Sequence, residues 1–338
     1  MRVGIVGARL QAKRRSAALA NLSNVEVAII SAEHMSSAES LADEIGCEAD
    51  SGWEWVSKRD DIDVVLVCTP PHLHHAISIA ALESGKHVLC EKPLSRTLDE
   101  AVEMSAVASE TGLSLKCGFN HRHHPGVQMA RKWIDEGRIG DLLFIRCRYG
   151  ICGRPGYESE WRTNPSIVSG GHLMEQGIHA IDLSRWFLGE FKEVNCFIST
   201  QYWQTGDLED NGFALYRTDE GCVASIHSSL TQWKNLFSFE IFGRDGYVVI
   251  EGLGGSYGTQ RVSLGKRDFD APFGDQVVEF SGGDRSWLHE WEEFVDAIQM
   301  GREPVGSATD GVEAMRLVMA AYEAARRGVT VSVHGDCK

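Results

Sequence analysis

The sequence lacks any apolar run of the roughly 18–20 residues that a membrane-spanning helix requires. Its opening stretch, MRVGIVGARLQAKRR, contains no apolar segment followed by a small-residue cleavage site, so we expect no secretory signal. The nine cysteines are odd in number and include no Cys-x-x-Cys pair, and two of them, Cys68 and Cys90, lie in apolar, strand-like runs. These features favour buried thiols in a reducing compartment over disulfides and predict a soluble cytoplasmic protein.

Positively charged residues are fewer than negatively charged ones. The 338 residues contain 33 Lys and Arg against 48 Asp and Glu, so the formal net charge is −15. DNA, RNA and anionic lipids repel an acidic surface, which disfavours a general role on any of them and leaves only a local basic patch open. Apolar residues make up 43% of the chain, enough for ordinary globular cores. At about 150 residues per domain, the length predicts two domains.

The first third of the chain alternates between strand-like and helix-like segments. The run Asp63–Cys68 (DVVLVC) is apolar nearly throughout, as expected of a strand that is covered on both faces. His74–Glu83 has helical character and is followed by Gly85, a common residue at the end of a helix. Such alternation implies right-handed crossovers and a parallel sheet. Residues 1–118 are therefore predicted to form a doubly wound, Rossmann-type domain of the α/β class.

Beyond Asn120 the pattern changes. A helix is expected over Met174–Phe187, followed by short apolar segments that are separated by turn sequences such as RTDEG and GRDG, which suit hairpins. Near the end of the chain, Trp287, Trp291 and Phe294 fall on one face of a further helix. Residues 119–338 are predicted to form a second, α+β domain with a large, mostly antiparallel sheet.

A dinucleotide-binding turn is expected where the first strand, Val3–Val6, meets the next helix. In the G-x-G-x-x-G/A fingerprint the first glycine makes the turn, the second lets the backbone approach a pyrophosphate, and the third permits close helix packing. Gly7 fits the first position and Ala12 is acceptable at the third. Arg9 replaces the second glycine; its side chain either obstructs the phosphates in part or binds them. Gly7, Arg9 and Leu10 are the cofactor contacts expected at this turn. The alternative is an α/β domain whose first turn binds nothing.

The acidic residue expected at the end of the second strand is also missing. Ser31 or Ala32 stands where an aspartate would accept hydrogen bonds from the ribose hydroxyls, and Glu33 is only a nearby substitute. Loss of that carboxylate removes the repulsion that excludes a 2′-phosphate. We therefore expect either NAD or NADP as the cofactor.

Four further segments occur in order: TPPHLH from Thr69, EKP from Glu91, GFNHR from Gly118 with Pro125 beyond it, and GGHLMEQGIHAID from Gly170. Together they resemble the glucose–fructose oxidoreductase / inositol dehydrogenase family (Gfo/Idh/MocA), and the resemblance covers essentially the whole chain. It implies a nicotinamide-dependent oxidoreductase whose C-terminal domain binds a sugar or sugar nucleotide and mediates oligomerisation. We expect a homodimer or homotetramer with no nucleic-acid or membrane partner.

The resemblance also implies catalytic roles. It makes Lys92 an active-site lysine, with a cis form open to the Lys92–Pro93 peptide, and it matches His179 with the catalytic histidine. The i,i+4 spacing of Glu175 and His179 predicts that both project from one helical face, where the carboxylate can orient the imidazole. Glu175 stands where the family usually carries aspartate, so either the pocket has adjusted or the activity differs from the commonest one. The alternatives without catalysis are a surface lysine in a turn and an interior histidine.

Further cofactor contacts are expected at the carboxyl ends of strands. Thr69 and Pro70 end a buried strand at the edge where open α/β sheets bind ligands, although simple loop punctuation is the alternative. Glu91 belongs to the same expected set, and His74 is expected to border the cofactor. Two histidine clusters lack the spacing of zinc sites, so no metal is predicted; they are His72/His74/His75 and His121/His123/His124.

A polar and aromatic loop precedes the helix of the catalytic histidine. Trp161 and Arg162 match a Trp-Arg pair that family members place near the nicotinamide. Arg154, Tyr157 and Arg162 are candidates to contact hydroxyl or phosphate groups, and the loop looks similar to that of members acting on nucleotide-linked amino sugars. The alternative is a surface loop pinned by Trp161. Further candidates for substrate binding or support are Asn120, Arg122 and Asp182.

The expected reaction is hydride transfer between nicotinamide and a ring hydroxyl carbon of a sugar or nucleotide-linked amino sugar, bound between the two domains. His179, oriented by Glu175, would take the hydroxyl proton, and Lys92 would stabilise negative charge on the same oxygen, or the two would exchange roles. Arg9, Ser31 and Glu175 depart from the family pattern. They motivate an alternative, a relative that has lost redox turnover and serves as a sugar-binding or regulatory subunit.

Overall fold

The computed structural model describes residues 1–270 and 274–335 and divides into two compact units. Unit 1 contains residues 1–120, 166–169 and 285–313, and unit 2 contains residues 121–165, 170–284 and the chain from 314 onward. Unit 1 is thus discontinuous in sequence. The division expected from the sequence, between residues 118 and 119, assigns residues 285–313 to the second domain.

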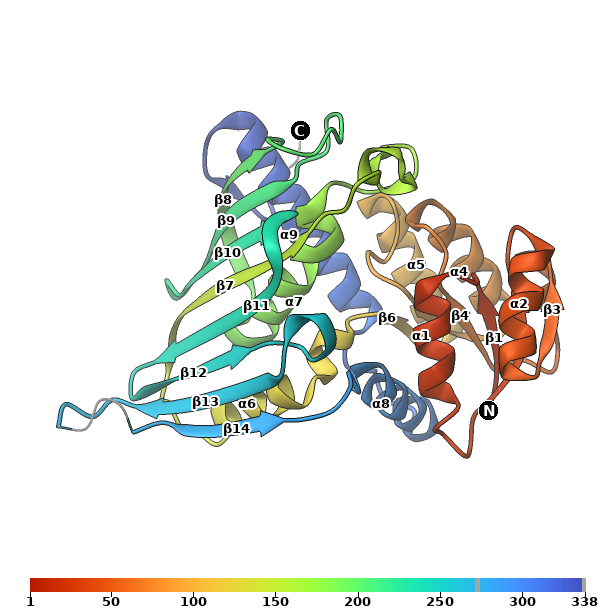
Figure 1. The fold of residues 1–338 in the computed structure, drawn as a ribbon, viewed down its shortest axis with the longest axis horizontal. Coiled ribbons are helices and arrows are strands. Elements are labelled where there is room, and N and C mark those ends of the chain that lie inside the picture. Colours follow the sequence, from red (N-terminus) through yellow and green to blue (C-terminus); the bar gives the residue numbers. More distant parts are fainter. Residues whose placement is uncertain (271–273, 336–338) are drawn as a thin grey trace. The chain divides into compact units, whose positions relative to one another are not determined.

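Unit 1 is built on a six-stranded parallel sheet with the order β3-β2-β1-β4-β5-β6 (Figure 1). The order reverses at β1, which is the arrangement of a doubly wound sheet, so the predicted Rossmann-type domain is confirmed. The strands are β1 (Arg2–Val6), β2 (Glu26–Ser31), β3 (Glu48–Asp50), β4 (Val64–Val67), β5 (His87–Cys90) and β6 (Leu115–Cys117). The helices are α1 (Leu10–Leu19), α2 (Met35–Ile45), α3 (Trp53–Lys58), η1 (Pro71–Leu73), α4 (His74–Glu83), α5 (Leu98–Thr111) and α8 (Ser286–Met300).

The sheet of unit 1 is buried on both faces. All four residues of β4, the sequence VVLV, are fully buried, which explains the nearly continuous apolar run at this point of the chain. On one face, Ile5 and Leu89 belong to a core cluster that also includes Trp291 and Phe294 of α8. This late helix therefore completes the core that the first strands begin.

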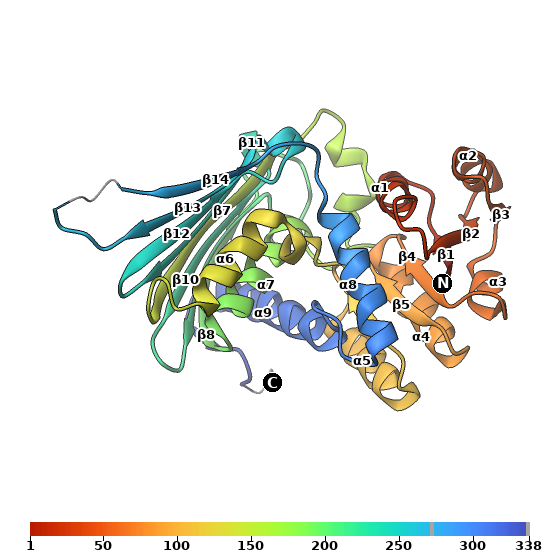
Figure 2. The same ribbon diagram turned by 90° about the horizontal axis from the view of Figure 1, so that it is seen from below.

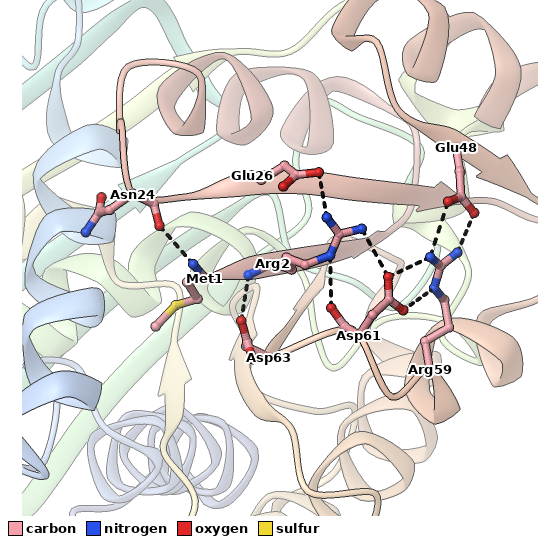
Figure 3. A network of polar contacts seen from close by, with 8 residues as sticks. All are labelled: Met1, Arg2, Asn24, Glu26, Glu48, Arg59, Asp61 and Asp63. Carbon is pink, nitrogen blue, oxygen red and sulfur yellow. Dashed lines mark hydrogen bonds and ion pairs between the residues drawn. The ribbon is translucent and has the colours of Figure 1, made fainter.

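The amino ends of these strands meet in a network of charged side chains (Figure 3). Arg2 donates to Glu26 at 2.7 Å and to Asp61 at 3.0 Å. Arg59 donates to both oxygens of Asp61 at 2.8 Å and thereby holds the pKa of that carboxyl well below its usual range. The backbone N–H of Arg2 donates to the carboxylate of Asp63 at 2.7 Å. This edge of the sheet is closed by the chain's own side chains.

Unit 2 is built on a nine-stranded sheet with the order β14-β13-β12-β11-β7-β10-β9-β8-β15. Its neighbouring strands are antiparallel except for the parallel pair β7 and β10, so the predicted mostly antiparallel sheet is confirmed. The strands are β7 (Leu142–Cys152), β8 (Phe191–Ser199), β9 (Asn211–Thr218), β10 (Val223–Ser229), β11 (Thr231–Gly243), β12 (Gly246–Glu251), β13 (Gln260–Lys266), β14 (Gln276–Phe280) and β15 (Val331–Ser332). The longer helices are α6 (Pro125–Asp135), α7 (Ile178–Leu188) and α9 (Ala308–Arg327), and the short ones are η2 (Asn120–His123), η3 (Tyr157–Ser159), η4 (Trp161–Thr163), η5 (Leu173–Gly177) and η6 (Gly255–Tyr257).

Helices cover one face of this sheet (Figure 2). Helix α6 packs on β12, β13 and β14, α7 packs on β7 and β10, and the hydroxyl of Tyr216 on β9 donates to the carbonyl of Leu317 in α9 at 3.1 Å. On β9 and its neighbour β8, side chains that alternate with the buried ones are exposed and apolar, namely Phe197, Phe213 and Leu215. The homo-oligomer expected from the sequence stays a prediction, and this face is its candidate interface.

Four strands of residues 1–270 and 274–335 lie outside the segments that the sequence predicts as strands, namely β3, β13, β14 and β15. Strands β3 and β15 have only three and two residues. Strands β13 and β14 were not predicted, because Val262 and Leu264 are their only deeply buried apolar side chains and the alternating pattern is too short to be recognised. The described cysteines are thiols; Cys90 is buried as expected, whereas Cys68 is half-buried and Cys152 is exposed. Cys337 lies outside the described residues. No helix in residues 1–270 and 274–335 is both long and apolar enough to cross a bilayer.

Candidate functional site

The turn between β1 and α1 depends on Gly7. Its φ of +114° is rarely adopted by residues with a side chain, and its N–H donates to the carbonyl of Ser31 at 2.7 Å. A Cβ atom at this position would lie 2.7 Å from the carbonyl oxygen of Cys68. The glycine therefore lets β1 turn directly beside β2 and β4, as the first position of the fingerprint requires.

Helix α1 begins immediately after this turn. Its N-cap is Arg9, whose side chain is exposed and makes no capping hydrogen bond with the described residues, and Leu10 is 58% exposed. The first N–H groups of a helix carry a partial positive charge that favours anions, and a pyrophosphate is the expected anion here. The exposed Arg9 leaves both expectations for its side chain, obstruction or phosphate binding, as predictions.

Two hydroxyls at the carboxyl edge of the sheet are buried and unsatisfied. Ser31 is the last residue of β2, and Thr69 follows β4. Neither Oγ of Ser31 nor Oγ1 of Thr69 has a hydrogen-bond partner within residues 1–270 and 274–335. Buried hydroxyls normally have partners, so such an atom calls for an explanation. Together with the open turn at Gly7, they fit a ligand rich in hydroxyl and phosphate groups, as a dinucleotide is. On this observation the residues present fit the expected cofactor.

His74 ties two loops of the same edge together. Its Nε2 lies 2.8 Å from the carbonyl oxygen of Thr69 and its Nδ1 lies 2.9 Å from that of Pro93. Burial lowers the pKa of His74. Pro70, which follows Thr69, is the N-cap of η1 and has an extended backbone conformation. His74 thus fixes the loop after β4 against the loop that carries Lys92, whether or not it also touches a cofactor.

Lys92 follows β5 and is half-buried. The Lys92–Pro93 peptide is cis, the form that the family resemblance left open. Asn120, another predicted site residue of unit 1, donates from Nδ2 to the hydroxyl of Ser286 at 2.8 Å. The loop of Lys92 is anchored on both sides, because Arg15 binds Glu91 before the lysine and His74 contacts the carbonyl of Pro93 after it.

Glu91 is anchored by a buried ion-pair network that the sequence did not reveal. Arg15 of α1 donates to Glu91 and to Glu290 of α8, each at 2.5 Å, and all three side chains are buried. Burial by itself lowers the pKa of Arg15, but the carboxylates of Glu290 and Glu91 outweigh it and raise that pKa. Arg15 is one of two adjacent arginines in the polar segment KRRS of α1, and this pattern gives no signal of its role.

In unit 2 the segment of Glu175 differs from the expected regular helix. The helix predicted over Met174–Phe187 is wrong at its start, because η5 is a π-helical turn and α7 begins only at Ile178. Gly177 makes the wide turn possible, since a Cβ there would lie 2.9 Å from the side chain of Leu173 and 3.0 Å from that of Ser228 on β10. The i,i+4 argument for Glu175 assumed α-helical geometry and does not apply to this turn.

The carboxylate of Glu175 binds two residues of the preceding loop. Arg162 Nε donates to one oxygen at 2.6 Å and the hydroxyl of Tyr157 donates to the other at 2.9 Å. Arg162 also stacks over Trp161, with its guanidinium carbon 4.5 Å from the ring centroid. Burial and the charge of Glu175 raise the pKa of Tyr157 above its usual range. The structure thus brings four predicted site residues, Tyr157, Trp161, Arg162 and Glu175, into one cluster.

Three other predicted residues are engaged in ion pairs. Arg122 and Asp182 form a buried bidentate pair at 2.7 and 2.8 Å. Arg154 forms a bidentate pair with Glu160 at 2.6 Å for both bonds, at a more exposed place. The buried pair favours the supporting role that the sequence left open for Arg122 and Asp182, and Arg154 stays a candidate for substrate contact.

His179 lies in the first turn of α7 and is buried. The ring of His121, from η2, stacks on it with centroids 3.8 Å apart. His121 belongs to the GFNHR segment and to one of the two histidine clusters of the sequence, but neither pattern predicts this contact. The run HRHH gave a signal of histidine enrichment but no information about which ring would meet α7.

A buried carboxylate fixes the chain that leads into η5. Glu209 accepts hydrogen bonds from the backbone N–H groups of Gly171 and Leu173 at 3.1 and 2.7 Å, and from the hydroxyl of Tyr322 at 2.8 Å. A Cβ on Gly171 would lie 2.4 Å from Glu209, so the glycine is required for this approach. The sequence GGH was the available signal for such a close contact, and Glu209 itself was missed.

Profiles of two protein families match the chain. An oxidoreductase family with an NAD-binding Rossmann fold, GFO_IDH_MocA, matches residues 1–119, and the GFO/IDH/MocA C-terminal domain matches residues 127–249. These two ranges cover most of unit 1 and the middle of unit 2. They agree with the family resemblance that the four sequence segments carry.

Several relatives are known by name. A dTDP-3,4-didehydro-2,6-dideoxy-alpha-D-glucose 3-reductase of Actinomadura kijaniata is 32% identical over 67% of each chain. Levoglucosan dehydrogenase of Pseudarthrobacter phenanthrenivorans is 34% identical over 59% of this chain and 58% of that relative, so this match spans little more than half of that relative's length. A solved levoglucosan dehydrogenase in complex with NADH has a TM-score of 0.91 and 28% identity over 98% of this chain and 99% of that chain. The chain therefore belongs to the GFO/IDH/MocA family of oxidoreductases, and its first 119 residues form an NAD-binding Rossmann domain.

Proposed function

We propose that the chain transfers a hydride between NAD or NADP and a ring hydroxyl carbon of a sugar, with nucleotide-linked amino sugars as the favoured subclass. The observation that carries the proposal is the open carboxyl edge of unit 1, where Gly7 makes a side-chain-free turn and the hydroxyls of Ser31 and Thr69 are buried without partners in the described residues. The sugar specificities of the named relatives support the substrate class.

The carboxyl edge of unit 1 supplies the groups that would hold the cofactor. The N–H groups at the start of α1, beside Arg9 and Leu10, suit the pyrophosphate, and the hydroxyls of Ser31 and Thr69 suit ribose and amide groups. When bound, the nicotinamide supplies the acceptor or donor of the hydride. His74 fixes the two loops of this edge through its contacts with Thr69 and Pro93.

His179 and Lys92 carry the proton chemistry in this proposal. In the oxidative direction the hydroxyl of the substrate gives its proton to the imidazole of His179, while the ammonium group of Lys92 donates a hydrogen bond to the same oxygen and stabilises its growing negative charge. The reverse assignment, with Lys92 as the base, is the second form of the proposal. Arg15 supports Lys92 indirectly, because it holds Glu91, the residue before it.

Glu175 and its partners form the substrate-recognition part of the proposal. The carboxylate binds Arg162 and Tyr157 together, so it fixes the direction of their remaining polar atoms. Trp161 offers an aromatic face, and aromatic faces pack well against the C–H groups of sugars. Arg154 and Asn120 are the further candidates for contact with substrate hydroxyl or phosphate groups. In this proposal Glu175 positions Tyr157 and Arg162 for the substrate, in addition to any orientation of His179.

Replacing the two proton-handling residues tests the function. Lys92→Ala and His179→Ala are each expected to lower kcat by about 100-fold or more, because a general acid–base group contributes about that much. Turnover is measured with a panel of sugars and nucleotide sugars and with NAD and NADP separately. Lys132→Ala and His75→Ala are matched controls, since the side chain of Lys132 is exposed, that of His75 is partly exposed, and each lies beside an acidic partner.

Three outcomes are informative. Loss of turnover with unchanged circular dichroism and unchanged NADH binding supports the assignment of Lys92 and His179. Near-normal turnover in both variants would refute the assignment. Failure of the unmodified protein to bind either NADH or NADPH, followed by nicotinamide fluorescence, would instead favour the redox-inactive, sugar-binding relative that Arg9, Ser31 and Glu175 motivate.

A further inference from the structure

Helix α8 carries three polar residues on one face that the proposed function does not use. Ser286, Glu290 and Glu293 are spaced i, i+4 and i+7, and they form the polar stripe of α8. Ser286 and Glu290 are fully buried, and the side chain of Glu293 is 16% exposed. Polar groups buried in a fold need hydrogen-bond partners, and each residue of the stripe has one within unit 1.

Glu290 reaches the loop of Lys92 through Arg15 of α1. Nη1 of Arg15 donates to Glu290 and Nε of the same guanidinium donates to Glu91, each at 2.5 Å. The two bonds use different nitrogens of one planar group, so they fix its orientation as well as its position. Gly118 makes room for this group, since a Cβ there would lie 2.7 Å from Nη2 of Arg15. The carboxylate of Glu91 is thus held from α8 by way of α1.

This contact bears on Lys92 because its two neighbours are fixed. The N–H of Glu91 donates to the carbonyl of the last residue of β4 at 3.0 Å. The carbonyl of Pro93 lies 2.9 Å from Nδ1 of His74. A displacement of about 1 Å in a catalytic group can cost about 100-fold in rate. An anchor on the side chain directly before Lys92 is therefore able to affect catalysis without touching the substrate.

The other two residues of the stripe hold the segment that contains β6. Nδ2 of Asn120, a predicted site residue, donates to the hydroxyl of Ser286 at 2.8 Å. Nζ of Lys116, which is fully buried on β6, donates to Glu293 at 3.0 Å. The polar stripe thus contacts the chain that follows β6 directly and the chain that follows β5 through Arg15. Both segments leave the sheet at its carboxyl edge.

The buried charges supply direction more than stability. A buried ion pair adds little net stability over apolar packing of the same volume, because the loss of hydration offsets the attraction of the charges. Trp291 and Phe294 already pack α8 into the core of unit 1. Apolar contacts resist separation but specify no particular pair of atoms, whereas the fork of Arg15 requires one carboxylate on each of two nitrogens.

We propose that the polar stripe of α8 positions two loops of the proposed active site. Glu290, acting through Arg15, holds the loop of Lys92, and Ser286 holds the loop of Asn120. This proposal rests on the proposed function, in which Lys92 stabilises charge on the reacting oxygen and Asn120 contacts the substrate. It predicts separate kinetic effects: loss of the contact of Arg15 lowers kcat, and loss of the contact of Ser286 raises the KM for the sugar.

Hydrogen exchange measured by mass spectrometry tests the first contact without using activity. Arg15→Lys keeps the positive charge but replaces the fork with a single ammonium group, so the two carboxylates are no longer held together. In the full-length protein, exchange in residues 91–95 should become about 10-fold faster, the effect of one bond to a charged group, while β4 keeps its rate. Lys13→Met is the matched control, because Lys13 is an exposed residue of α1 that pairs with Glu44. It should change neither segment.

Kinetics with the sugar of highest turnover then separate the two contacts. Arg15→Lys should lower kcat by about 10-fold and change KM by less than about twofold, because a displaced Lys92 acts on the transition state. Ser286→Ala should raise KM by about 3- to 10-fold with little change in kcat, since Asn120 loses one hydrogen bond. Glu292→Gln is the matched control on α8, where its exposed side chain lies outside the stripe, and it should leave both constants unchanged.

The exchange rates decide whether the contact of Arg15 positions the loop. Unchanged exchange in residues 91–95 of Arg15→Lys overturns the proposal. Equal acceleration in β4 also overturns it, because a general loss of stability opens every strand. If Arg15→Lys does not fold, Glu290→Gln takes its place: the amide keeps the shape of the side chain and removes its charge. Exchange in residues 91–95 should then rise by a smaller factor, and no rise overturns the proposal.

The kinetic results distinguish this proposal from the proposed function. Faster exchange in residues 91–95 with an unchanged kcat counts against Lys92 as a reacting group and not against the contact of Arg15. An unchanged KM in Ser286→Ala overturns the second contact. If no sugar is turned over by the unmodified protein, the proposed function fails, and the exchange rates still decide whether Arg15 holds the loop.

Discussion

The two edges of the sheet in unit 1 are built from the same strands but differ in how their polar groups are satisfied. At the amino edge, Arg2, Arg59 and Asp61 saturate one another (Figure 3). At the carboxyl edge, the hydroxyls of Ser31 and Thr69 are buried without a partner in the described part of the chain. An unsatisfied buried polar group costs about 1–3 kcal/mol, so it persists where a ligand completes it. Of the two edges, the carboxyl edge is thus the one whose open hydroxyls suit a ligand.

The sharpest way to break this comparison is to fill the open turn. Gly7→Val should weaken NADH binding by about 100-fold or more, because its Cβ would lie 2.7 Å from the carbonyl oxygen of Cys68 and a φ of +114° disfavours a β-branched residue. The dissociation constant is measured by nicotinamide fluorescence. Gly85→Ala is the matched control, since Gly85 also has a positive φ but has open space around it, just before β5. Equal loss of binding in both variants would contradict the role of the turn.

Adding a carboxylate to the carboxyl edge should change which cofactor is preferred. Ala32→Asp should lower the affinity for NADPH relative to NADH by about 10-fold, because an aspartate after β2 accepts bonds from the ribose hydroxyls and repels a 2′-phosphate. Position 32 is half-buried, whereas Ser31 is only 1% exposed, so the charge is better tolerated at 32. Titrations with both cofactors give the ratio. A ratio that does not change would place the ribose elsewhere.

Removing an open hydroxyl should separate cofactor binding from stability. Thr69→Val should weaken NADH binding by about 3- to 10-fold, the effect of one hydrogen bond, and should leave Tm unchanged or raise it, because the hydroxyl has no partner in the described residues. Thr97→Val is the opposite case: Thr97 caps α5 by accepting from the N–H of Glu100, so Tm should fall and NADH binding should not change. The same response from both variants would argue against a ligand at Thr69.

The smallest effect is expected at the closed edge. Asp61→Asn should lower Tm by at most a few degrees and leave NADH binding unchanged, because surface ion pairs stabilise weakly. Arg59 lowers the pKa of Asp61 in the folded protein, so this stabilisation is present above the pKa of the unfolded carboxyl, about 3.9, and is lost as the pH falls through the folded value. The difference in Tm between the two proteins should therefore shrink below about pH 4. A difference that grows in acid would reverse the sign of this argument.

The parts of the molecule that could be predicted are those that local chemistry determines. The apolar run Asp63–Cys68 predicts β4 because a strand covered on both faces has no polar face to show. Gly7 predicts the first turn because few other residues adopt its φ. The parallel and antiparallel sheets follow from the spacing of such segments, and the family follows from four short motifs in order.

The parts that could not be predicted depend on which distant side chains meet. Nothing local to Arg122 indicates that it pairs with Asp182, 60 residues away, or that His121 stacks on His179. The π-helical turn at Glu175 was missed because it depends on Gly177 lying against β10. Helix propensity depends on the residues of one segment, so it carries no information about the strand that packs against that segment.

Helix α8 has a consequence for how the protein is made. Trp291 and Phe294 are fully buried in the core of unit 1, and Glu290 balances the charge of the buried Arg15. When only the first 120 residues have left the ribosome, the sheet therefore lacks the helix that covers one of its faces, and Arg15 lacks one of its two carboxylate partners. Expression of residues 1–120 alone should give an insoluble product, whereas a fusion that appends residues 285–313 should give a soluble one.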